Sequence, residues 1–164
     1  MKIPVSAFVL LFFLVCGCTA LRGQDPVPQA KLYPVDTILA AETKTAVSFE
    51  TMIADLETVS VVYVGEAHIN PAHHEIQLRV LKGLYERHPG KIAVGMEMFA
   101  RPYQEFLAKW VDGGLSEEAF LKKTHWYANW RYDFSLYRDL LNEIQQNRIP
   151  LYGLNIEFHI PSKI

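Results

Sequence analysis

The sequence predicts an α/β domain, a three-layer fold based on a βαβ unit with a small, mostly parallel sheet, in an incomplete version of a larger domain. Two short runs rich in β-branched and apolar residues, 59–64 and 92–96, flank a stretch with helical periodicity. Both runs are apolar on both faces, as buried parallel strands require. The chain has 164 residues, of which 50% are hydrophobic, so it is long enough for one domain with a core.

The other elements follow from hydrophobic periodicity and from residues that begin or end helices. Ser48, Asn70 and Ser116 are suited to cap helix N-termini, and Pro71 suits a first helical position. Residues 125–134 are too aromatic and irregular to assign. In chain order we expect a hairpin at 37–47, a helix at 48–57, the strand at 59–64, a helix from Asn70 to the stop at Pro89-Gly90, the strand at 92–96, helices at 102–111, from Ser116 and at 134–146, and a strand at 149–156.

The first 17 residues are typical of a lipoprotein signal peptide. Lys2 is followed by an apolar run, 3–15, that is shorter than the roughly 20 residues of a membrane span. The run ends in Leu-Val-Cys-Gly-Cys, which resembles a bacterial lipobox, and Cys18 is the better acylation site because the small Gly17 precedes it. An ordinary cleaved signal peptide is the alternative.

This interpretation divides the chain into a signal peptide at 1–17, a lipid anchor and proline-containing tether at 18–35, and a domain at 36–164. Thr19 after the lipid-bearing cysteine favours an outer-membrane lipoprotein, facing the periplasm or the cell surface. The membrane is thus an expected partner through Cys18. The net charge of −2 contains no basic block, so nucleic acid is not an expected partner.

Acidic and histidine side chains gather where the first predicted strand ends and the next helix begins. Glu66 and His68 follow strand 59–64, His73 and His74 lie in the first helical turn, and Glu97 ends strand 92–96. Ligands bind outside the carboxyl ends of parallel strands, and adjacent strands lie about 4.8 Å apart, so these groups can approach one another. Helical spacing places His73 near the middle of the apolar face, pointing toward the sheet and the pocket, and His74 toward its flank.

Such a set has three chemical uses. It can bind a divalent metal such as zinc, bind haem, or perform acid–base chemistry without a metal. Tyr127 and Tyr132 are candidate axial ligands of a haem iron. Tyr137 lies on a helical apolar stripe, which favours a role in core packing. A histidine at a helix start can also act only as a cap, and an acid at a strand end can act only as an ion-pair partner.

The segment VVYVGEAHINPAHHEIQLRVLKGLYERHPGKIAVGMEMF resembles the ChaN-like haem-binding lipoproteins of the Tiki superfamily. The resemblance covers roughly residues 48–156 and depends on Gly-Glu-x-His at 65–68, His-His at 73–74 and Gly-Met-Glu-Met-Phe at 95–99. It implies haem binding for iron uptake, and a homodimer that brings two haems together. The implied cofactor-binding residues are Glu66, His68, His73, His74, Glu97, Tyr127 and Tyr132.

The resemblance leaves two alternatives. Tiki-type members are metal-dependent proteases, and that pattern implies His68 and Glu97 as metal ligands with Glu66 or His73 assisting. Such a hydrolase would use Glu66, His68 and Glu97, with zinc activating water. It ranks second because the closer resemblance is to the haem-binding branch. Family members usually continue past the third strand, whereas little follows Asn155 here, so a non-functional truncated fragment is the other alternative.

Overall fold

The computed structural model describes residues 32–156 of the chain, and the compact unit within it begins at Thr37. The signal peptide at 1–17, the acylation site at Cys18 and most of the tether lie outside the described residues. Within residues 32–156, no helix has both the length and the apolar character needed to cross a bilayer.

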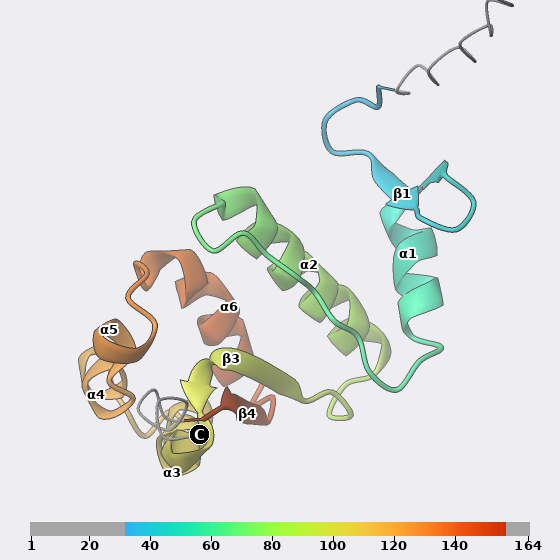
Figure 1. Ribbon diagram of the computed structural model, residues 1–164. Coiled ribbons are helices and arrows are strands. Elements are labelled where there is room, and N and C mark those ends of the chain that lie inside the picture. The colour runs from blue at the N-terminus through green and yellow to red at the C-terminus, as the bar shows by residue number, and fades with distance from the viewer. Residues whose placement is uncertain (1–31, 157–164) are drawn as a thin grey trace, which may run out of the picture. The chain divides into compact units, whose positions relative to one another are not determined.

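The described chain combines helices with two small sheets, one of them parallel, which confirms the predicted α/β class with a small parallel sheet (Figure 1). All of the predicted helices form, with ends that shift by one or two residues. An additional helix, α5, occupies the aromatic segment. The elements are β1 (Ile38–Ala40), β2 (Thr45–Val47), α1 (Phe49–Leu56), α2 (Pro71–Arg87), β3 (Val94–Ala100), η1 (Arg101–Tyr103), α3 (Gln104–Val111), α4 (Glu117–Lys123), α5 (Trp126–Asn129), α6 (Ser135–Gln146) and β4 (Leu151–Asn155).

Side-chain caps fix the starts of three helices as predicted. Ser48 accepts a hydrogen bond from the Thr51 amide at the start of α1, and Ser116 accepts one from Ala119 at the start of α4. Asn70 accepts one from the Ala72 amide at 3.0 Å, directly ahead of Pro71. Each cap satisfies a backbone donor that the first helical turn leaves free. The cap at Asn70 matters most here because it fixes the start of α2, and therefore the positions of the two histidines in its first turn.

Two small sheets form. The predicted hairpin is confirmed as β1 and β2, which pair antiparallel. The second sheet pairs β3 and β4 in parallel, and the chain between them passes through η1 and helices α3 to α6. Val94 pairs with Leu151 and Met96 with Gly153, but the next pair is Ala100 with Asn155, so β3 bulges over the intervening residues.

The predicted strand at 59–64 does not form. The segment runs alongside α2 and pairs with neither sheet (Figure 1). Val62 packs against a cluster of apolar side chains from α1 and α2, while the adjacent Tyr63 is 92% exposed. Across 60–64, the only hydrogen bond to the backbone that the described residues supply is from the Gln77 side-chain amide to the Val64 carbonyl oxygen. The predicted βαβ unit at 59–96 therefore lacks its first strand.

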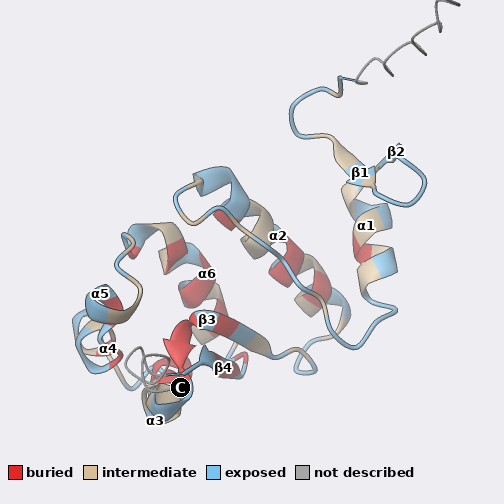
Figure 2. Ribbon diagram, viewed as in Figure 1, coloured by how far each residue is buried: buried red, intermediate tan, exposed pale blue. Residues whose placement is uncertain are grey.

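The main core is formed by side chains of β3 and β4 and of helices α2 to α6 (Figure 2). It is rich in aromatic side chains, and Tyr137 is fully buried there, which confirms its predicted place in the core. A smaller cluster of Ile53, Val80 and Leu84 joins α1 to α2. Helix α2 thus carries two apolar stripes, one facing each cluster.

Candidate functional site

Three of the predicted side chains meet in one place. Glu66, His68 and Glu97 each offer a potential ligand atom, and these atoms all lie within 4.8 Å of one another. Glu97 is about thirty residues distant in sequence, so the fold and not local spacing brings it to the other two. The predicted approach of these three residues is confirmed, although the strand expected to carry Glu66 and His68 is an extended segment instead.

Glu97 lies within β3 and not at its end, because the strand runs on to Ala100. It falls in the bulge of the β3–β4 pair, where the Asn155 side-chain amide donates to the Glu97 carbonyl oxygen at 3.1 Å. A Cβ atom on Gly153 would come within 2.9 Å of the carbonyl oxygens of Phe99 and Ala100. Glycine at this position therefore permits the backbone approach that shapes the strand beside Glu97.

The Glu66 carboxylate is buried, with its side chain 4% exposed. Its Oε1 lies 2.8 Å from Nδ1 of His68 and accepts a hydrogen bond from the Tyr137 hydroxyl at 2.7 Å. Its Oε2 lies 3.0 Å from Nδ1 of His74, close enough for an ion pair but without hydrogen-bond alignment. A buried carboxylate is costly unless it has donors or opposite charges nearby, and here His68 and Tyr137 supply donors to Oε1 while His74 lies within ion-pair distance of Oε2.

The two histidines of α2 have the reverse of their predicted positions. His73 is exposed, and its Nδ1 accepts a hydrogen bond from the Ala67 amide at 2.8 Å, so it stabilises the turn before α2. His74 is buried at 6% exposure, and its Nε2 donates to the His68 carbonyl oxygen at 3.0 Å. His74 is thus in contact with the cluster, and His73 is not among the three grouped potential ligands.

The reason is that α2 has two apolar stripes. The expected position of His73 rested on the stripe through Ile76, Val80 and Leu84, which faces α1. The other stripe runs through Leu78, Leu81 and Tyr85 and faces the main core. His74 begins that second stripe at the i, i+4, i+7 spacing of a helix face.

Aromatic rings line one side of the cluster. The His68 ring centroid lies 4.7 Å from that of Trp130 and 4.9 Å from that of Tyr132. The His74 ring packs edge-on against Tyr137 at 4.4 Å. Tyr132 therefore lies beside the cluster as a candidate ligand should, while Tyr127 is exposed and, in the part of the chain described, has no ring contact with either histidine.

Two residues of the site were not among the predicted ligands. Trp130 came from the segment that had no assigned structure. The Tyr137 hydroxyl had no predicted partner because core packing was the favoured role of that residue, although a buried tyrosine usually finds a partner for its hydroxyl. Burial, with the Glu66 carboxylate next to it, raises the pKa of the Tyr137 phenol well above its ordinary value, so it remains a hydrogen-bond donor to Glu66.

A cavity of about 240 Å³ adjoins the cluster, and Glu97 and Trp130 are in its wall. Its other lining residues come from the ends of β3 and β4 and from α5, namely Met98, Ala100, Asn129, Asn155 and Ile156. The cavity is smaller than the roughly 300–1,000 Å³ of most small-molecule sites. A flat ligand the size of a porphyrin would therefore be only partly enclosed by the described residues.

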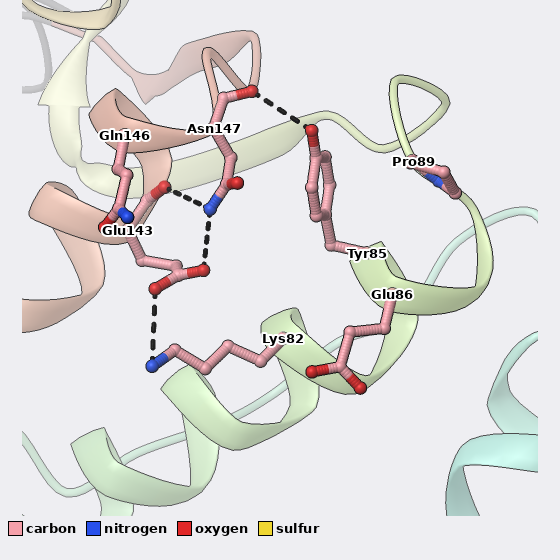
Figure 3. A pocket seen from close by; sticks show the side chains of 7 residues that line it. All are labelled: Lys82, Tyr85, Glu86, Pro89, Glu143, Gln146 and Asn147. Atoms are coloured by element: carbon pink, nitrogen blue, oxygen red, sulfur yellow. Dashed lines mark hydrogen bonds and ion pairs between the residues drawn. The ribbon is translucent and has the colours of Figure 1, made fainter.

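A second cavity, of about 450 Å³, lies between α2 and α6 and contains none of the predicted residues (Figure 3). Four of its lining residues bind one another. Lys82 pairs with Glu143 at 3.3 Å, Glu143 accepts from the Asn147 side chain, and Tyr85 donates to the Asn147 carbonyl oxygen. This cavity therefore has no evident chemical role.

The cluster combines one imidazole with two carboxylates beside aromatic rings. Imidazole and carboxylate together suit zinc, and imidazole beside flat apolar rings suits a haem iron. Both uses need a free ring nitrogen, and Nε2 of His68 has no hydrogen-bond partner in residues 32–156.

Comparison with known proteins gives one family and one solved structure. The family model described as "Haem-binding uptake, Tiki superfamily, ChaN" matches residues 52–164. The structure described as "Cofacial heme binding to ChaN of Campylobacter jejuni" matches with a TM-score of 0.68 at 21% sequence identity, a level that shows a shared fold. The match covers 77% of this chain and 51% of that one, so this chain spans about half of that protein's length. No curated protein matches the chain.

Proposed function

The chain belongs to the ChaN family of haem-binding uptake proteins in the Tiki superfamily, and on that premise we propose that it binds haem and takes part in haem or iron uptake. The observation that carries the proposal is the setting of His68. Its imidazole is 35% exposed, is held at Nδ1 by Glu66, and lies against the rings of Trp130 and Tyr132. A histidine held in this way would leave Nε2 free to bind a haem group.

The aromatic side chains supply the apolar contact that a porphyrin face requires. Tyr132 is the better placed of the two candidate tyrosines because its ring is beside His68. Glu97 and Asn155, at the cavity, offer polar groups at the rim. The small cavity volume also supports a homodimer, since a second copy would cover the haem surface that one chain leaves open.

The test is a titration of the full chain with haemin, followed by absorbance in the Soret region. We expect a saturable shift near one haem per chain that His68→Ala weakens strongly. The matched control is His88→Ala, which removes an imidazole that pairs with Glu57 away from the cluster. Absence of any saturable shift in a folded sample would contradict the proposal and favour the non-functional fragment. An equal loss in both variants would contradict the role of His68.

We also propose that the protein is an outer-membrane lipoprotein anchored through Cys18, facing the periplasm or the cell surface. The support is the sequence pattern alone: the apolar run at 3–15 and the Gly17-Cys18 pair. In cells, Cys18→Ser should abolish incorporation of a labelled fatty acid and release the protein from the membrane fraction. Cys16→Ser is the control and should leave both unchanged. Retention of the label in Cys18→Ser would contradict this anchor.

A second candidate function is a metal-dependent hydrolase, which the grouping of Glu66, His68 and Glu97 specifically favours. Two carboxylates and an imidazole are a donor set that zinc accepts, and zinc supplies an activated water when bound. Elemental analysis of the purified chain should then show about one zinc per chain, which Glu97→Gln reduces. Unchanged metal content in Glu97→Gln, or a purified chain without metal, would exclude this candidate while leaving the haem proposal in place.

A further inference from the structure

Residues 125–132, which include α5 and are called the aromatic loop below, have a strained backbone on both sides of the helix. His125 precedes α5 with a φ of 51°, and Arg131 comes after it with a φ of 71°. Neither residue is a glycine, and in this left-handed region a side chain raises the energy of the backbone. Such a conformation persists only where the surrounding structure holds it, so other contacts must hold the aromatic loop in place.

Two side chains close the aromatic loop by donating to backbone carbonyl groups. The indole Nε1 of Trp126 donates to the Tyr132 carbonyl oxygen at 2.8 Å. The side-chain amide of Asn129 donates to the Thr124 carbonyl oxygen at 3.1 Å. The first bond connects the start of α5 to the end of the loop, and the second connects the end of α5 to the residue before the loop. Each of the two strained residues therefore lies within a segment that one of these bonds closes.

Trp126 also anchors the aromatic loop in the main core. Its side chain is 1% exposed and packs against three other core rings at centroid separations of 5.2, 5.3 and 5.5 Å, those of Tyr137, Phe134 and Phe99. The indole N–H is the only polar group of a tryptophan side chain, and here it binds the Tyr132 carbonyl oxygen. Trp126 therefore connects the end of the loop directly to the core.

The aromatic loop forms one wall of the cavity beside the cluster. Asn129 and Trp130 line that cavity. The rings of Trp130 and Tyr132 lie against His68, where the proposed function places the face of a porphyrin. A wall that is already held in its binding conformation avoids the cost of ordering these side chains when the ligand binds. The contacts that hold the loop should therefore contribute to affinity.

From these contacts we propose that Trp126 is a positioning residue: its indole N–H holds the backbone of Tyr132 so that the rings of Trp130 and Tyr132 form a fixed wall for a flat porphyrin. Trp126 itself does not touch the ligand, since it is buried and is not part of the cavity wall. This inference rests on the proposed function, because it assigns Trp126 a role in the same site. It does not depend on which atom binds the haem iron.

The test compares two tryptophan substitutions in the full chain. Trp126→Phe keeps an aromatic ring in the core and removes the indole N–H. Trp110→Phe is the matched control, because Trp110 is also buried, at 3% exposure, and its Nε1 donates to the Leu141 carbonyl oxygen at 3.1 Å. Each variant thus loses one buried bond from an indole to a backbone carbonyl group, and both should lose stability. Trp110 lies outside the aromatic loop, so only Trp126→Phe should change the cavity wall.

The first readout is hydrogen exchange without haem. We expect the backbone amides of 127–132 to exchange faster in Trp126→Phe than in the wild type, and at the wild-type rate in Trp110→Phe. The second readout is a haemin titration. Haem affinity should fall by roughly tenfold in Trp126→Phe, which is the order that one buried hydrogen bond supports, and should stay close to the wild-type value in Trp110→Phe.

Unchanged exchange of the aromatic loop in a folded Trp126→Phe would overturn the role of Trp126. Equal losses of haem affinity in the two variants would overturn it too. If Trp126→Phe fails to fold, the wild type decides: its Trp126 indole N–H should exchange as slowly as the amides of the core, and rapid exchange would overturn the proposal. Failure of the wild type to bind haem would instead overturn the proposed function, and the exchange measurements would still decide whether Trp126 holds the loop.

Discussion

Glu66 and Tyr137 are 71 residues apart in the sequence, and the Tyr137 hydroxyl donates to the Glu66 carboxylate at 2.7 Å. This bond connects the Gly-Glu-x-His motif to the centre of the main core through α6. The site therefore depends on the core for its geometry. A substitution of Tyr137 should alter both the free energy of unfolding and the binding of a ligand at the site.

Tyr137→Phe tests this dependence. The substitution retains the ring in the core but removes one donor from a buried carboxylate, so we expect a loss of roughly 1–3 kcal/mol in the free energy of unfolding. Urea denaturation measures it. Tyr85→Phe is the control, because that hydroxyl makes a longer 3.3 Å bond to the Asn147 carbonyl oxygen and its loss should cost less. Equal losses in the two variants would contradict the special role of the Glu66–Tyr137 bond.

The ion pair between Glu117 and Arg138 should make stability depend on pH. Nε and Nη2 of Arg138 each lie 2.9 Å from a Glu117 carboxylate oxygen, and this hydrogen bonding lowers the pKa of Glu117 below its ordinary value of 4.5. Because the pKa of Glu117 is lower in the folded state, the ion pair stabilises the fold at pH values above the unfolded-state pKa. This stabilisation is lost as the pH falls through the folded-state pKa.

Glu117→Gln should therefore lower the melting temperature by a few degrees at pH 7, and the difference should shrink toward zero as the pH falls below 4.5. Thermal unfolding of both proteins across this pH range checks it. Glu118→Gln is the control, because it removes a charge from the same first turn of α4 without removing this ion pair. A difference that stays constant with pH would show that the ion pair is not its source.

Two glycines near the site should differ in how well they tolerate an added methyl group. Gly153→Ala places Cβ against the carbonyl oxygens of Phe99 and Ala100, which cannot move without disturbing the bulge beside Glu97. We expect it to destabilise the fold by about 1–3 kcal/mol, as overpacking does. Gly65→Ala meets no atom within 4 Å and should be nearly neutral. Denaturant unfolding measures the free energy of unfolding of the two variants. A larger loss in Gly65→Ala than in Gly153→Ala would contradict this argument.

The sequence predicted the helices well because their signals are local. Caps at Ser48, Asn70 and Ser116 lie within three residues of the amides they satisfy. The grouping of Glu66, His68 and Glu97 was predicted as well, since each follows or lies in an apolar run. The sequence did not correctly predict which histidine of α2 faces the site. The helix has two apolar stripes, and periodicity does not say which of them faces the core.

The segment 59–64 shows a different limit. Its β-branched residues favour an extended backbone, and the backbone is extended without a strand partner. Pairing needs the edge of another strand, which is a property of the whole fold and is not encoded in the six residues themselves. Burial on both faces, which the composition suggested, also depends on neighbours, and here only the side of Val62 is covered.

This lack of pairing can be tested by hydrogen exchange of the full chain. Amides of Val61, Val62 and Tyr63 have no backbone acceptor among the described residues, whereas the β3–β4 ladder engages backbone groups around Val94 and Met96. We expect the three amides to exchange like those of an exposed loop, while the β3 amides exchange slowly. The amides of α2 provide an internal reference, because they are hydrogen-bonded within the helix and should exchange only when the helix unfolds. Protection of Val61–Tyr63 equal to that of β3 would show that this segment pairs as a strand in solution, and that the site is built on a third strand after all.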